Sequence, residues 1–198
     1  MKFAPSLFTI VGIAAVILVP LAHLDGINRF AQLPPVLALH IVAVGGFIAW
    51  MIWGRWRSSL LVLPALVFLL AEVVSVFQAQ SRVLSLLPIS THWAGFALFL
   101  ALLNGLKRDA FFKVVRVACV VAGVLSMFGL MQFWGIGQTW VPTAGLPSAT
   151  FGHRNLAAAY LIGMIPLTFW LWWSVQDRWT ALGWGVILGL EGAFLLAT

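Results

Sequence analysis

Charged residues are scarce in this chain. They make up 8% of its 198 residues, against about 25% in a typical soluble domain. With so little charge the chain cannot cover a water-facing surface, which excludes a soluble enzyme, a disordered protein and a nucleic-acid-binding domain. Only one cysteine is present, Cys119, so neither an internal disulfide nor a cysteine-rich metal site can form.

Apolar residues dominate instead, at 63% of the chain with a mean hydropathy of +1.06. They gather in runs of 16 to 21 residues, the length that a helix needs to cross a bilayer, and these runs do not alternate as barrel strands do. The pattern predicts an all-α, polytopic transmembrane helix bundle of about seven spans, forming a single transmembrane domain over residues 1–198. The predicted spans are Leu7–Ala22, Pro35–Trp53, Ser59–Phe77, Thr91–Leu106, Val114–Trp134, Asn155–Trp173 and Thr180–Ala197.

The distribution of basic residues predicts the orientation. With the amino terminus inside, eight Lys and Arg residues fall on the cytoplasmic side and three on the outer side, which satisfies the positive-inside rule. The three on the outer side are Arg29, Arg82 and Arg154. The four histidines then lie on the outer side or in the outer half of a helix, at His23, His40, His92 and His153. We therefore expect any binding surface to face outward; the alternative is that each histidine is solvated separately at the interface.

The segment FGHRN leads from a long outer loop into the sixth predicted span. A helix amino terminus carries unpaired N–H groups and a partial positive charge, so a guanidinium beside it makes a ready anion site, suited to phosphate. The residues of this candidate site are Gly152, His153, Arg154 and Asn155. The alternative is an ordinary helix start, with Arg154 reaching toward lipid headgroups and with the cap supplied by Ser148, Thr150 or Asn155.

Two acids, Glu72 and Glu191, fall inside predicted spans. A charged group at the bilayer centre costs about 2.5–3.5 kcal/mol on insertion scales, so each should face the bundle interior and be paired or protonated. Arg82 follows Glu72 too distantly along a helix to pair with it directly. Either the two acids bind substrate or protons, or they make interhelical hydrogen bonds.

The run SATFGHRNLAAAYLIGMIPL resembles the signature of the O-antigen ligase and polymerase family. In that family a Phe-Gly-x-x-Asn segment opens a helix rich in small residues that ends near Ile-Pro. Upstream, LVLPALVFLLAEVVSVFQAQSRVLSLLPISTHWAGFALFL is similar to the family's helix, serine, short outer loop and helix, with Ser75 at the serine. The ending GAFLLAT is similar to a stretch that precedes a Ser-Arg-Gly turn in relatives. The matching positions of the first run are Thr150, Phe151, Gly152, Asn155, Ala157, Ala158, Tyr160, Leu161 and Pro166.

The resemblance implies a membrane glycosyltransferase of the bacterial inner membrane with its site facing the periplasm. Such proteins transfer a glycan from undecaprenyl diphosphate to lipid A–core, to another glycan or to a protein. They use no nucleotide sugar, metal or other cofactor. A diphosphate leaving group gains negative charge as the glycosidic bond breaks, and Arg154 is the residue we expect to stabilise it.

Family members are longer, and their large periplasmic loop, with its histidine and arginine, has no counterpart up to Thr198. We therefore expect an amino-terminal portion that is inactive by itself, and we assign no catalytic residue, because these would lie beyond Thr198. Two other readings stay open. One is a transporter, since chains of this superfamily have been linked to inorganic-carbon uptake. The other is a non-catalytic membrane subunit.

Overall fold

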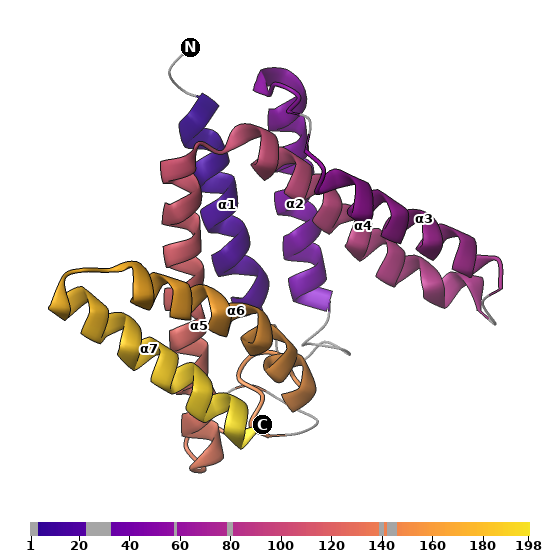
Figure 1. The fold of residues 1–198 in the computed structure, drawn as a ribbon. Coiled ribbons are helices and arrows are strands. Elements are labelled where there is room, and N and C mark those ends of the chain that lie inside the picture. The colour runs from indigo at the N-terminus through magenta and orange to yellow at the C-terminus, as the bar shows by residue number, and fades with distance from the viewer. Residues whose placement is uncertain (1–3, 23–32, 58, 79–80, 139–140, 142–145) are drawn as a thin grey trace. The chain divides into compact units, whose positions relative to one another are not determined.

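The structure, a computed structural model, describes residues 4–22, 33–57, 59–78, 81–138, 141 and 146–198. This part of the chain is all-helical, as predicted, and contains no strand (Figure 1). Five of its helices are long and apolar enough to cross a membrane, and two shorter apolar helices accompany them. The helices are α1 (Ala4–Leu21), α2 (Leu33–Trp53), α3 (Val62–Val76), α4 (Arg82–Gly105), α5 (Arg108–Phe133), α6 (Arg154–Ser174) and α7 (Arg178–Ala197).

Each predicted span coincides with one helix, but α4 begins well before its predicted start. It starts at Arg82, not at Thr91, and carries Pro88 in its interior. Polar residues near the predicted start bond back to the helix itself, since the hydroxyl groups of Ser90 and Thr91 both donate to the carbonyl of Leu87. Hydroxyl groups that bond to a carbonyl one turn back are satisfied within a helix, so local polarity was a poor guide to its start.

The described residues form two compact units. The first comprises the described residues within 1–15 and 36–110, and the second comprises those within 16–35 and 111–198. In the first unit α3 and α4 form an antiparallel hairpin (Figure 1). Small residues dominate its core, where Ala43 and Ala94 pack with Leu98. Small side chains let helices approach closely. Close packing of this kind holds helices together in lipid, where burying apolar surface gives no hydrophobic stabilisation.

In the second unit α6 and α7 form another antiparallel hairpin (Figure 1) and α5 packs against it. Leu161 and Phe194 are completely buried in its core. At Gly129 of α5 an added Cβ would lie 2.2 Å from the Phe194 ring, so only glycine leaves room for that ring. Between the two helices, Asp177 caps α7 by accepting hydrogen bonds from the backbone N–H (2.8 Å) and hydroxyl (2.7 Å) of Thr180.

Candidate functional site

The predicted anion site lies where α6 begins. His153 is the N-cap: its backbone is extended, and its Nδ1 accepts a hydrogen bond from the backbone N–H of Asn155 at 3.2 Å. Gly152 precedes it with φ +71°, a conformation that favours glycine. The sequence reading proposed Ser148, Thr150 or Asn155 as the cap. That was wrong, because Ser148 and Thr150 are buried within the loop and Asn155 lies inside the helix.

Gln132, near the end of α5, holds the loop in place. Its Oε1 accepts hydrogen bonds from the backbone N–H groups of Ser148 (3.0 Å) and Ala149 (2.8 Å), and its Nε2 donates to the carbonyl of Ala149 at 3.2 Å. Gln132, Ser148 and Ala149 are all completely buried. The sequence analysis missed Gln132, although a lone amide in the apolar run GLMQFW is the one local signal that points to it.

Two further contacts fasten the same loop. The hydroxyl of Thr150 donates to the carbonyl of Pro20 in α1. The ring of Phe151 packs against that of Tyr160 in α6, with ring centroids 5.0 Å apart. Tyr160 therefore packs on the loop beside the candidate site. With the loop held from α1, α5 and α6, the exposed side chains of Arg154 and Asn155 project from a fixed support.

At this helix start the groups that remain available to bind an anion are mainly side chains. The N–H of Asn155 is taken by His153, and the N–H of Leu156 donates to the carbonyl of His153 at 3.1 Å. Two of the N–H groups that an anion would use are therefore satisfied internally. The guanidinium of Arg154, with its fork of donors, is the group best suited to an anionic oxygen here.

Of the secondary candidates, the structure brings Glu72 and His92 together. The Nδ1 of His92 and the Oε1 of Glu72 form a hydrogen bond that links α3 to α4. The Phe68 ring packs edge-on against His92, with ring centroids 5.6 Å apart. His92 is well inside α4 and does not open it, contrary to the sequence reading. Arg82 is the first residue of α4, but its side chain, and the predicted positions His23 and Arg29, lie outside the described part of the structure.

Glu191 belongs to a different cluster, within the second unit. It is completely buried, and its Oε1 accepts a hydrogen bond from the Thr168 hydroxyl of α6 at 2.9 Å. The second carboxyl oxygen of Glu191 and the hydroxyl of Ser126 are buried and have no partner among the described residues. The interhelical hydrogen bond that was one of two predicted alternatives is thus present.

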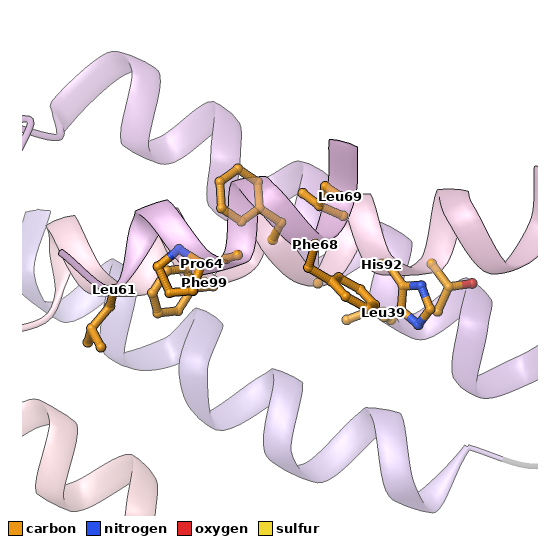
Figure 2. Close-up of a pocket in the computed structure, with 11 residues that line it drawn as sticks. Leu39, Leu61, Pro64, Phe68, Leu69, His92 and Phe99 are labelled. Carbon is orange, nitrogen blue, oxygen red and sulfur yellow. The ribbon is translucent and has the colours of Figure 1, made fainter. Parts of the chain in front are cut away.

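A pocket that the sequence did not indicate lies between α2, α3 and α4 (Figure 2). Its volume is about 590 Å³, inside the range of about 300–1,000 Å³ that is usual for small-molecule sites. The lining is apolar apart from Thr91 and His92 at one end. The residues that line it are Leu39, Leu61, Pro64, Ala65, Phe68, Leu69, Thr91, His92, Gly95, Phe96 and Phe99.

Comparison with known proteins adds no relationship: no family model matches the chain, and neither a curated protein nor a solved structure does. Within the described residues, no group of three or more histidine, cysteine or acidic side chains is placed to hold a metal ion.

Proposed function

We propose that this chain is part of a membrane glycan transferase of the O-antigen ligase type. It takes a glycan from undecaprenyl diphosphate and passes it to lipid A–core or another acceptor at the periplasmic face of the bacterial inner membrane. The several apolar helices of the chain support a place in a membrane. The transfer itself rests on the sequence resemblance around FGHRN and on the geometry of that segment.

The observation that carries the proposal is the contrast between Arg154 and the loop before it. Ser148, Ala149 and Thr150 are buried and held by hydrogen bonds, whereas the arginine that follows is exposed. Because the backbone before Arg154 is held in place, only the arginine side chain has to be ordered when a diphosphate binds. An arginine that served only to reach lipid headgroups would not need a loop fastened from three helices.

The role of Arg154 in this proposal is electrostatic. As the bond between the sugar and the diphosphate breaks, negative charge collects on the leaving oxygens. The parallel N–H groups of a guanidinium stabilise that charge in the transition state more than they stabilise the lipid-linked glycan before the bond breaks. Removing one donor of this kind typically lowers a rate by about 10²–10³.

The test is a chromosomal Arg154→Ala substitution in cells that make the protein. We expect glycan attachment to fall by about 10²-fold or more, seen as loss of the ladder of glycan-bearing product on a gel while the undecaprenyl-linked glycan accumulates. Arg178→Ala is the matched control, because Arg178 is also an exposed first residue of a helix, α7. An unchanged ladder with Arg154→Ala protein present at normal abundance would contradict the assignment.

A transporter is the second candidate, and Glu191 is the observation that favours it. A buried intramembrane carboxyl with an oxygen that lacks a partner is typical of proton and ion pathways. Glu191→Gln keeps the size of the side chain and an acceptor for Thr168. If this variant attaches glycan normally but loses uptake of a solute such as bicarbonate, the transporter replaces the transferase. If both variants leave glycan attachment and uptake unchanged, the chain is a non-catalytic subunit.

A further inference from the structure

The pocket between α2, α3 and α4 is elongated along α3. Leu61, Pro64 and Phe99 lie at one end of it, Leu39 and His92 lie at the other, and Phe68 lies between them (Figure 2). Its walls therefore offer an apolar channel that leads to a single polar end. This arrangement matches an amphiphile, a molecule with an apolar chain and one polar head, better than it matches a compact polar solute.

Glu72 extends this channel by one helical turn. It follows Phe68 at the i+4 position, so the two side chains share a face of α3. It bonds to His92, which lines the pocket, through one carboxyl oxygen. The other oxygen, Oε2, is buried and has no partner among the described residues. A buried carboxyl oxygen is stabilised by a hydrogen-bond donor, and a bound ligand can supply the donor that the described residues do not.

The carboxylate at the polar end of the pocket determines which kind of hydrogen-bond donor can bind there. The lining residues include no lysine or arginine, so the carboxylate of Glu72 favours a positively charged N–H donor and disfavours an anion. A primary ammonium offers three N–H groups, whereas a quaternary ammonium offers none. Glu72 lies four residues before the end of α3, about 6 Å along its axis, which is a suitable depth for a lipid headgroup.

We propose that this pocket binds a membrane lipid whose headgroup carries a primary ammonium, with an acyl chain lying between α3 and α4 and the ammonium donating to Glu72. The site is separate from the start of α6 and does not depend on the proposed transfer reaction.

The experiment measures which lipid the purified full chain retains. The protein is purified in detergent, incubated with an equimolar mixture of phosphatidylethanolamine, phosphatidylcholine and phosphatidylglycerol of identical acyl chains, and washed, and the bound lipid is quantified by native mass spectrometry. We expect about ten times as much phosphatidylethanolamine as phosphatidylcholine to be retained, because one charge-assisted hydrogen bond raises affinity by about that factor. Equal retention of these two lipids, or a preference for phosphatidylglycerol, would overturn the proposal.

Two variants separate the two ends of the pocket. Glu72→Gln removes the charge, and we expect it to retain lipid but to lose the preference for phosphatidylethanolamine. Gly95→Leu fills the channel, because Gly95 lines the pocket and an added Cβ there meets no atom within 4 Å; we expect it to retain little lipid of any kind. Gly163→Leu, at a glycine of α6 with equally open surroundings, is the control and should behave as the wild type.

A competition experiment then tests whether the pocket binds the whole lipid or only its headgroup. Soluble ethanolamine carries the same ammonium but has no chain to fill the pocket, so we expect it not to displace bound phosphatidylethanolamine at millimolar concentration. Displacement by ethanolamine, or a wild-type preference that survives in Glu72→Gln, would show that the pocket and the carboxyl do not act together and would overturn the proposal.

Discussion

Glu72 and Glu191 are both acids within strongly apolar helices, yet their surroundings differ. Glu191 is completely buried and bonds to a neutral hydroxyl, whereas Glu72 is 19% exposed and bonds to an ionisable imidazole. The difference follows from how closely the helices around each acid approach. Gly123 and Gly129 of α5 let Ile187 and Phe194 of α7 come against the α5 backbone, on either side of Glu191. In the α3–α4 hairpin, by contrast, Gly95 faces open space, and α3 buries only Val62 and Leu69.

This contrast shows that intramembrane acids of one residue type take different roles according to the packing of their neighbours. Close packing buries Glu191 completely, whereas loose packing beside Glu72 leaves a pocket of about 590 Å³ that its partner His92 lines. Each acid keeps one buried carboxyl oxygen that has no partner among the described residues. Position along the helix does not distinguish the two cases, because Glu72 and Glu191 both lie in the second half of an apolar helix.

The largest effect should come from truncating the buried acid. Glu191→Ala leaves a cavity and removes the acceptor of the Thr168 hydroxyl, so we expect the free energy of unfolding to fall by about 2–4 kcal/mol. Glu72→Ala should lower it by less than about 1 kcal/mol, because its hydrogen bond to His92 is partly exposed. Unfolding in mixed micelles, followed by tryptophan fluorescence, measures both. Equal effects would remove the distinction between the two sites.

A pair of glycine substitutions sharpens the comparison without touching either acid. Gly129→Ala forces a methyl group against the Phe194 ring, and we expect a loss of stability of about 1–3 kcal/mol. Gly95→Ala meets open space, and alanine has the higher helix propensity, so this variant should be as stable as the wild type or slightly more stable. Thermal unfolding of the two proteins in the same detergent decides the matter; a destabilised Gly95→Ala would mean that α3 and α4 pack more tightly than described.

Gln132 tests whether the second unit also holds the loop before α6. Gln132→Ala removes three hydrogen bonds to Ser148 and Ala149, and we expect a loss of about 1–3 kcal/mol, limited by water entering the loosened loop. In limited proteolysis we then expect the variant to be cut near residues 146–153 and the wild type to resist cleavage there. Gln138→Ala is the control, because the bond that Gln138 makes to a described residue is the one that it donates to the backbone carbonyl of Gln132. A loop that stays resistant in Gln132→Ala would show that Thr150 and Phe151 suffice to hold it.

The smallest effect belongs to the exposed acid between α6 and α7. Hydrogen bonds from the backbone N–H and hydroxyl of Thr180 lower the pKa of Asp177. A group whose folded pKa is lowered stabilises the fold above its ordinary pKa of about 3.9 and loses that contribution as the pH falls below it. Asp177→Asn should therefore match the wild type in acid and be slightly less stable at neutral pH. Thermal unfolding at both pH values measures the difference; equal stability of the two proteins at neutral pH would contradict the cap.

Most of the fold could be predicted from hydropathy, because each span carries its own signal in 16 to 21 consecutive residues. The start of α4 could not, since the apolar run that predicted the span begins only at Thr91, whereas the helix begins at Arg82. At the candidate site the sequence predicted that a helix starts near Arg154, where α6 begins. The cap was misassigned, because whether a serine, threonine or histidine caps a helix depends on which of them the loop buries.

The sequence by itself determined that this protein is helical and apolar enough for a membrane, because backbone groups in lipid must be satisfied within each segment. The tertiary structure decided which polar groups meet. Gln132 with the loop, Glu191 with Thr168, Glu72 with His92, and Thr150 with Pro20 are pairs of groups on different segments, as far as 130 residues apart. Such pairs depend on how closely backbones approach at particular glycines and turns, a distance that no local pattern of residues encodes.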